Sequence, residues 1–356
     1  MPIVPLYGHE SIRRRLRRMV DGGSLPASVL FEGARGTGKQ RLALWLAQLL
    51  VCERDEKPCG TCLACRSVLN LRHPDVFWVY PRPRLSDANA TSDDVIEDLF
   101  EASEERLAKH GLYARPSGSE AIFLATTLTI VGKAAMSPSM GRRKIFIVGD
   151  AERMVAQEGS DQAANAFLKL LEEPPADTTI LLTSSEPGAL LPTIRSRIVS
   201  IRCAPLADTE VLAFVRDPTV KVGLDLLDLP RGDAERVALA RGAPGDLLSV
   251  ATLSSARAAA LRMLDAASTR GAERYAMALA QGSAGARGAF SDMLSELNVL
   301  LRQRVESSLA SGDTDGAYFA AKAVVAVAEA QTRADGNVSP QLTAAALIDA
   351  LHGVPT

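Results

Sequence analysis

The residues best suited to chemistry in this chain form a glycine-rich loop, Gly33-Ala34-Arg35-Gly36-Thr37-Gly38-Lys39-Gln40. In a phosphate-binding loop of the pattern G-x-x-x-x-G-K-S/T, backbone N–H groups and the lysine hold phosphates, and the final hydroxyl ligates Mg²⁺. Gln40 replaces that hydroxyl, and its longer amide side chain is a poor ligand for a small cation with strict octahedral geometry. The loop therefore predicts ATP binding with a weak Mg²⁺ site. The residues assigned to the nucleotide are Gly33, Gly36, Gly38, Lys39 and Gln40.

The segments on either side of the loop support this assignment. Residues 27–32 read as a short buried strand, and residues 41–50 place apolar side chains at helical spacing. A strand, a glycine loop and a helix in this order direct a helix N-terminus at phosphate. A second apolar run, 144–148, leads to Asp150, which we assign to the Mg²⁺ side of the same site. A glycine-rich turn in another α/β fold is the alternative.

Four of the five cysteines, Cys52, Cys59, Cys62 and Cys65, form a C-x6-C-x2-C-x2-C pattern. A reducing compartment argues against disulfides, and this spacing places four thiolates around one tetrahedral ion. We predict one structural zinc ion in a small knob over residues 52–65, with no open position for catalysis because sulfur fills every coordination site. Free or redox-active thiols are the alternative. Cys203 stands apart near the end of an apolar strand, and we interpret it as an inert core residue.

Composition narrows the class of protein. The chain has 356 residues, 47% of them hydrophobic, which is enough for two or three globular domains. We expect a cytoplasmic protein with no membrane partner, because the start does not resemble a signal peptide and the longest apolar run is too short to span a bilayer. A net charge of −2 excludes nucleic-acid binding by bulk positive charge. The local basic run at 13–18 is interpreted as the solvated face of an amphipathic helix, with a patch that contacts a nucleic-acid backbone as the alternative.

Several motifs together resemble the AAA+ clamp-loader subunits of bacterial DNA polymerase III. They are YGHE at 7–10, the zinc cysteines after the loop helix, NAFLKLLEEPP at 165–175, SSEP at 184–187 and LPTIRSR at 191–197. The resemblance covers roughly residues 1–80 and 141–250. It implies that Ser184 is the sensor-1 residue of the nucleotide site. It also implies that Arg197 reaches in trans into the ATP site of a neighbouring subunit.

Three positions depart from the active members of this family. Gln40 replaces the Mg²⁺-binding hydroxyl, and Ala151 stands where a glutamate polarises the attacking water. Asp246, in the GAPGD segment at 242–246, stands where the family has a sensor-2 arginine, and a carboxylate there repels phosphate. Within the family, delta-prime subunits are the ones known for degenerate sites. The resemblance is therefore strongest to delta-prime, and intrinsic ATPase activity is not expected.

The expected organisation is an α/β AAA+ domain, a helical lid and a helical collar. The AAA+ domain spans 1–204, with a parallel sheet, the zinc knob at 52–65 and an insertion at 81–120. The lid spans 205–253, and the collar that joins subunits spans 254–356, where the chain becomes alanine-rich. The insertion carries an acidic helix, which we expect to be solvated. Its acidic residues are Asp93, Asp94, Glu97, Asp98, Glu101, Glu104 and Glu105.

These observations predict a delta-prime-like subunit that assists ATP-driven loading of the sliding clamp on primed DNA. The expected partners are the gamma/tau and delta subunits, the sliding clamp and, within the complex, primed DNA. One alternative is an active ATPase of the gamma/tau type, in which Gln40 and Glu152 replace the missing groups. Another is a zinc-stabilised nucleotide-binding adaptor outside replication.

Overall fold

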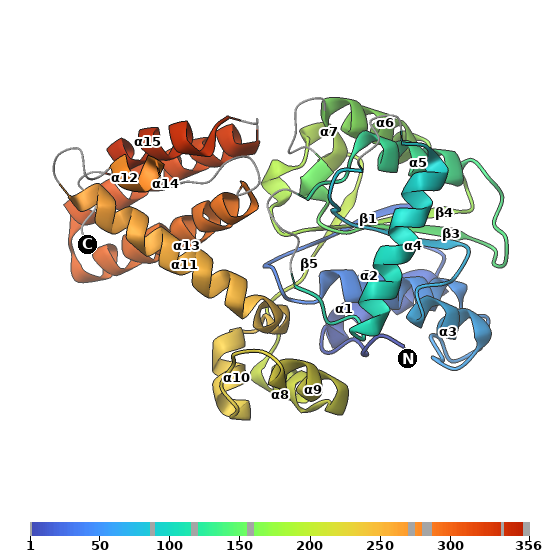
Figure 1. The fold of residues 1–356 in the computed structure, drawn as a ribbon. Coiled ribbons are helices and arrows are strands. Elements are labelled where there is room, and N and C mark those ends of the chain that lie inside the picture. The colour runs from blue at the N-terminus through green and yellow to red at the C-terminus, as the bar shows by residue number, and fades with distance from the viewer. Residues whose placement is uncertain are drawn as a thin grey trace. The chain divides into compact units, whose positions relative to one another are not determined.

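The computed structural model of the chain (Figure 1) describes residues 2–85, 90–114, 120–154, 160–269, 275–279, 287–335 and 338–351. The chain divides into two compact units, which meet in sequence between Ser249 and Val250. The first unit holds most of residues 1–249, and the second holds residues from 250 onwards. Within the described ranges, no helix combines the length and hydropathy that a bilayer crossing requires.

The first unit is built on a five-stranded sheet in which every pairing is parallel. The strands are β1 (Ser28–Glu32), β2 (Val76–Val79), β3 (Lys144–Val148), β4 (Thr178–Ser184) and β5 (Val199–Arg202). Their order across the sheet is β2-β3-β4-β1-β5. This confirms the predicted α/β class and the predicted parallel sheet.

Helices cover both faces of this sheet, and the strands are apolar on both faces for that reason. In β1, Val29 and Phe31 enter one core, while Leu30 between them enters the other. Figure 1 shows the helices α1 (Glu10–Asp21), α2 (Lys39–Val51) and α3 (Leu63–Leu69) on one side. On the other side lie α5 (Leu124–Ala134), α6 (Ser160–Glu172) and α7 (Pro192–Arg195).

The predicted insertion contains α4 (Ser92–Ala108), which begins with a capping box between Thr91 and Asp94. Two of the acidic side chains of α4 have arginine partners: Asp98 is partly buried, while Glu104 remains 40% exposed, as expected of a solvated face. Asp98 pairs with Arg82 at 2.9 Å, and Glu104 pairs with Arg72 at 2.9 Å. Both arginines precede α4 in the sequence, one shortly before β2 and the other shortly after it. The acidic residues therefore help to fix α4 against the body of the unit.

After β5, the first unit continues with α8 (Asp208–Arg216), α9 (Pro218–Asp225), α10 (Asp233–Ala240) and the 3₁₀ helix η3 (Pro244–Ser249). These helices share a small core around Val211, Phe214, Leu224 and Leu247. The core also takes in Val4 from the start of the chain. The region predicted as a lid thus has its own core and is tied to the N-terminal segment.

The second unit is helical. It contains α11 (Val250–Ser268), α12 (Ala276–Leu279), α13 (Arg287–Ser311), α14 (Thr314–Asp335) and α15 (Pro340–Ala350). Alanine and leucine side chains dominate its core, where small residues let the helices approach closely. The predicted division into an AAA+ domain, a lid and a collar, with boundaries at 204 and 253, stays a prediction.

Candidate functional site

The candidate site lies at the carboxyl edge of the sheet, where β3, β4 and β1 are neighbours. The glycine-rich loop follows β1, Gly149 and Asp150 follow β3, and Ser184 ends β4 between them. Parallel strands end at the same edge, and ligands of open α/β sheets bind there. The structure thus brings together all the residues assigned to the nucleotide.

The loop has the backbone conformation that its glycines permit. Gly36 and Gly38 have φ values of +71° and +88°, in the left-handed region that favours glycine. A Cβ atom at Gly33 would collide with the carbonyl oxygen of Cys203, so that position also needs a glycine. Gly38 is the residue before the first turn of α2.

Lys39 is buried and turns back onto its own loop. Its Nζ donates to the carbonyl oxygens of Gly33 (2.9 Å) and Ala34 (2.8 Å) and to Ser185 Oγ (3.0 Å). Burial lowers the pKa of this amine, while the nearby carboxylates of Asp150 and Glu152 oppose that shift. The ammonium group therefore has three protein partners in the position from which it would contact phosphate.

Gln40 occupies the space between the loop and β3. Its Nε2 donates to Asp150 Oδ2 at 3.0 Å. Its Oε1 accepts from Trp78 Nε1 at 3.0 Å and from the Tyr113 hydroxyl at 3.3 Å. Both ends of the amide are thus bonded to the protein, and one oxygen of Asp150 receives an N–H donor rather than facing an open metal position.

Gly149, directly after β3, is the residue nearest to this amide. A Cβ atom added at Gly149 would lie 2.5 Å from Gln40 Oε1 and 2.6 Å from its Cδ, closer than atoms can pack. A side chain at residue 149 would therefore require the Gln40 amide to move away from its present partners. Asp150 reaches Gln40 from the next position, with φ at +48° and its N–H bonded to Thr183 Oγ1 at 3.0 Å.

A buried arginine packs against the aromatic partners of Gln40. The Arg106 guanidinium, from α4, lies 4.3 Å from the ring centroid of Trp78, 3.1 Å from that of Tyr80 and 3.7 Å from that of Tyr113. Arginine over aromatic faces is favourable, and more so away from water. The predicted insertion thus contributes both Arg106 and Tyr113 to the wall of the site.

A second carboxylate of the site, Glu152, lies beside the end of β4. Glu152 is buried, and its Oε1 accepts the backbone N–H of Ser185 at 3.0 Å. Burial, together with the charge of Asp150, raises the pKa of Glu152. Ser184 is also buried, and its Oγ accepts the N–H of Glu186 at 3.1 Å. Ser185 rather than Ser184 is therefore the residue that contacts the loop lysine.

The segment with Asp246 lies directly against the loop. A Cβ atom at Gly36 would lie 2.7 Å from Asp246 Oδ1, and Gly245 N–H donates to the Gly36 carbonyl at 2.9 Å. The YGHE motif contacts the same region from the other end of the chain, because His9 Nε2 lies 2.7 Å from the Thr37 carbonyl oxygen. The loop is thus enclosed by η3 and by the start of α1.

Arg197 lies apart from this site, two residues after α7. Its guanidinium pairs with Glu172 at 2.7 Å, and its Nη1 donates to the Thr193 carbonyl at 2.8 Å. About a third of the side chain is exposed, at 35%. Both partners hold the group at the surface, and its described contacts include no residue of the nucleotide site of its own chain.

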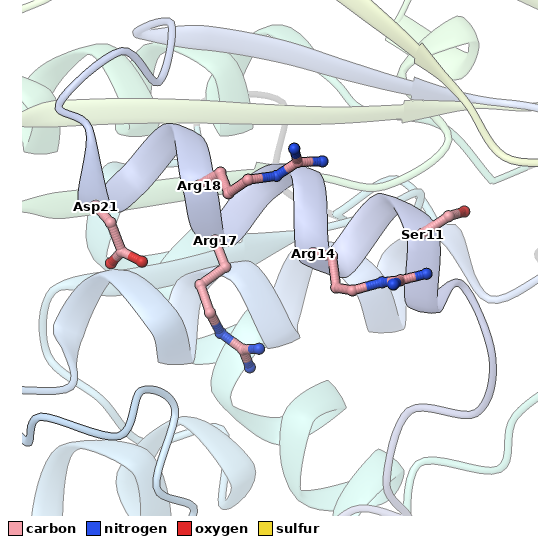
Figure 2. Close-up of a pocket in the computed structure, with 5 residues that line it drawn as sticks. All are labelled: Ser11, Arg14, Arg17, Arg18 and Asp21. Atoms are coloured by element: carbon pink, nitrogen blue, oxygen red, sulfur yellow. The ribbon is translucent and has the colours of Figure 1, made fainter.

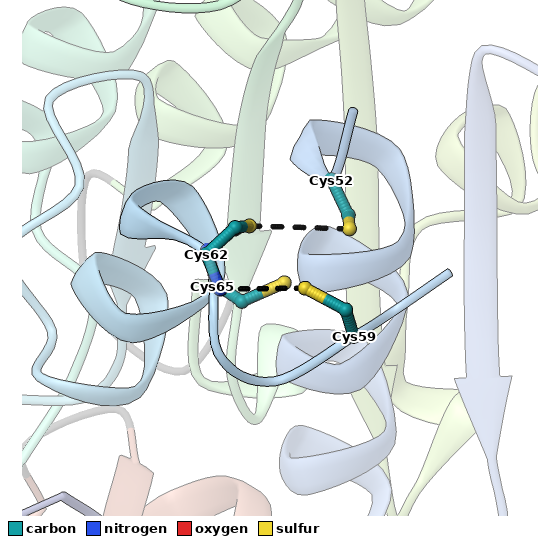
Figure 3. A group of neighbouring side chains, drawn as sticks. All are labelled: Cys52, Cys59, Cys62 and Cys65. Carbon is teal, nitrogen blue, oxygen red and sulfur yellow. Dashed lines mark hydrogen bonds between the residues drawn. The ribbon is translucent and has the colours of Figure 1, made fainter. Parts of the chain in front are cut away.

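The four cysteines come together as their spacing predicts. Cys52 follows α2, Cys59 and Cys62 lie in the loop after it, and Cys65 is in α3. Their sulfur atoms all lie within 4.8 Å of one another, and Figure 3 shows them turned towards a common centre. Four sulfurs about 2.3 Å from a tetrahedral ion would be about 3.8 Å apart, so the cluster is close to the required size.

Backbone N–H groups donate to two of the four sulfur atoms. Cys62 N–H donates to Cys59 Sγ at 3.3 Å, and Cys65 N–H donates to Cys62 Sγ at 3.4 Å. The first of these bonds, with help from Thr61, lowers the pKa of Cys59 to about 6. The thiolate is the form that ligates metal. The donor set therefore fits a structural metal ion such as zinc.

Three features of the site were not predicted. Trp78 and Tyr113 bond to Gln40, and Ser185 bonds to Lys39. Trp78 could have been noticed, because it lies at the end of an apolar strand, but an aromatic side chain in such a strand predicts core packing. Tyr113 lies in the insertion, which has no counterpart in the motifs, so the sequence contained no signal for it.

Comparison with known proteins gives consistent matches. A family model described as DNA polymerase III, delta subunit, matches residues 8–207. The chain is 28% identical over 233 residues to DNA polymerase III subunit delta' of Bacillus subtilis, covering 65% of this chain and 58% of that protein. It is 34% identical over 177 residues to subunit delta' of Pseudomonas aeruginosa, covering 49% and 42%.

A different subunit type also matches. The chain is 31% identical over 194 residues to DNA polymerase III subunit gamma/tau of Mycobacterium tuberculosis, covering 54% of this chain and 27% of that protein. Across the two delta' proteins, the chain spans about half the length of the curated relatives it matches.

Proposed function

The chain belongs to the DNA polymerase III, delta subunit family, and from this premise we propose that it works as a delta-prime-type clamp-loader subunit whose own nucleotide site is inactive. It would assist the ATP-driven loading of a sliding clamp on primed DNA, together with gamma/tau and delta subunits. The family match favours this role over an adaptor outside replication. Matches to both delta' and gamma/tau proteins support a place among subunits of this kind.

The bonding of the Gln40 amide is the observation that supports an inactive nucleotide site. A Mg²⁺ ion at this position would have to displace the hydrogen bond from Gln40 to Asp150 and compete with two donors for Oε1. Mg²⁺ requires about six oxygen ligands in near-ideal octahedral geometry, which this arrangement does not offer. Without the metal, the transferred phosphate loses its main source of charge neutralisation.

The runner-up, an active gamma/tau-type ATPase, receives less support. It requires Gln40 to ligate Mg²⁺ and Glu152 to activate water. The Gln40 oxygen already accepts from Trp78 and Tyr113, and one Glu152 oxygen already accepts from Ser185. Both groups would need to leave these partners.

Arg197 is the group through which we propose that the chain contributes to chemistry. An arginine that reaches the transferred phosphate of a neighbouring subunit stabilises the transition state by on the order of a thousandfold or more. The pairing of Arg197 with Glu172 near the surface supports this role, because a charged group held near the surface can exchange one carboxylate partner for a phosphate. The zinc knob, in this proposal, is structural and has no part in catalysis.

The test uses rings reconstituted from native partner subunits. The isolated chain should show no ATPase activity above background, and Gln40→Thr alone should not create it, because the glutamate that activates water would still be missing at Ala151. Arg197→Ala should leave the chain folded and able to assemble. It should lower the DNA-stimulated ATPase rate of the ring by the fraction that one ATP site contributes. Clamp loading should fall further, because it depends on several sites acting together.

The control is Arg195→Ala, which removes another exposed arginine two residues away. This variant should keep wild-type ATPase and clamp loading. Equal values for Arg197→Ala and Arg195→Ala in both assays would exclude the role in trans. Steady turnover by the isolated wild-type chain would instead support the gamma/tau-type alternative.

A further inference from the structure

The arginines of α1 divide into two groups with different surroundings. Arg13 and Arg17 lie over the Trp45 ring, with guanidinium carbons 5.0 and 5.9 Å from its centroid. Arg13 also pairs with Glu10 at 3.1 Å, and Arg17 donates to the carbonyl of Lys57 at 3.2 Å. These two side chains hold α1 against α2 and the zinc knob. They therefore have a structural role without any ligand.

Arg14 and Arg18 have no such role. Both are exposed, and among the residues that the structure describes neither guanidinium has an ion pair or a hydrogen bond. They stand four residues apart on one helix face, where like charges destabilise the helix. Together with Ser11, Arg17 and Asp21 they line a hollow of about 550 Å³. Figure 2 shows the guanidinium groups spread along the helix between Ser11 and Asp21.

We propose that this face of α1 binds the phosphate backbone of duplex DNA. The helix rises about 1.5 Å per residue, so Arg14 and Arg18 are about 6 Å apart along its axis. Successive phosphates of one DNA strand are separated on this same scale, so the two guanidinium groups can contact neighbouring phosphates. The planar guanidinium also offers paired N–H donors that fit phosphate oxygens.

The chemistry of the hollow favours DNA over an acidic protein. Specific protein interfaces have an apolar centre with aromatic or aliphatic anchors. The residues that line the hollow are all polar or charged, and two of them, Arg14 and Arg18, present guanidinium groups that have no partner among the described residues. Asp21 would repel phosphate, so the part of α1 that contacts the DNA backbone ends before this residue. The chain carries a net charge of −2, which means that this basic face is a local feature and not a consequence of overall charge.

The test measures binding of the full chain to a fluorescein-labelled 30-base-pair duplex by anisotropy, at several salt concentrations. The variant is Arg14→Ala/Arg18→Ala. The control is Arg257→Ala/Arg262→Ala, which removes two exposed arginines from α11 of the second unit and changes net charge equally. At low salt the first variant should bind at least about tenfold more weakly than wild type, and the slope of log K against log salt should become shallower by about 2, or about 0.9 per lost phosphate contact.

The control should bind as wild type does. Circular dichroism should be the same for all three proteins, and neither variant should unfold at a lower temperature than wild type, since both substituted positions in α1 are exposed. Equal DNA affinity of wild type and Arg14→Ala/Arg18→Ala would overturn the proposal, as would the absence of duplex binding by wild type. Tighter binding of a poly-glutamate peptide with the same sensitivity to this variant would assign the face to an acidic protein instead. None of these outcomes depends on the role of Arg197.

Discussion

The Gln40 amide can be tested as a structural element of the first unit. Gln40→Ala removes one hydrogen bond to a carboxylate, Asp150, and two from the neutral donors Trp78 and Tyr113. A buried group that loses its partner costs about 1–3 kcal/mol, and more when it is charged. The bond from Tyr113 is long, at 3.3 Å, and Asp150 is only partly buried. We therefore expect the free energy of unfolding to fall by about 2–4 kcal/mol.

Urea unfolding followed by tryptophan fluorescence is the appropriate assay. The chain has two tryptophans, Trp45 and Trp78, and both lie in the first unit, so the signal reports that unit without the helical one. With a denaturant dependence of about 3 kcal/mol per molar urea, the midpoint should fall by about 1 M. Gln303→Ala, at an exposed position on α13, is the control and should leave the midpoint unchanged.

A second substitution separates the amide N–H from the size of the side chain. Gln40→Glu keeps the acceptor for Trp78 but places a second carboxylate against Asp150, so it should destabilise the unit more at pH 8 than at pH 5. An unfolding midpoint for Gln40→Ala equal to that of Gln303→Ala would refute the argument that this amide holds the site together.

Two further predictions concern the cysteine cluster and the second buried carboxylate. Protein purified without added metal should contain about one zinc ion, which Cys62→Ser should lower and Cys203→Ser should leave in place; four freely titrating thiols without bound metal would contradict the site. Glu152 has a pKa raised above its ordinary 4.5, so the stability that its protonation contributes is lost as the pH rises through the raised value. Glu152→Gln should therefore raise the thermal unfolding midpoint more at pH 8 than at pH 5, and the opposite order would contradict the direction of this shift.

The sequence predicted the elements that obey local rules. The buried strand before Gly33 and the helix after it follow from an apolar run, a glycine loop and helical spacing, and all three are present. The cysteine cluster was predictable as well, because short spacing alone keeps four thiols close together. The alternating burial of strands and the alanine-rich helices of the second unit follow from periodicity in the same way.

The contacts around Gln40 could not be predicted, because they depend on chain segments that are distant in sequence. Trp78 and Tyr113 reach the same amide from 38 and 73 residues away. The sequence indicated that Gln40 is a poor Mg²⁺ ligand, but not that its amide has its own set of partners. Only the strand order, with β4 between β1 and β3, determines which residues meet at this edge.

The close fit of Gln40 against Gly149 makes the two positions interdependent. A side chain introduced at residue 149 would push the Gln40 amide away from its partners, while a shorter side chain at residue 40 removes the hydrogen bonds to Asp150 and from Trp78. Either change costs hydrogen bonds that the other residue's present identity maintains, so we expect positions 40 and 149 to constrain each other's substitution.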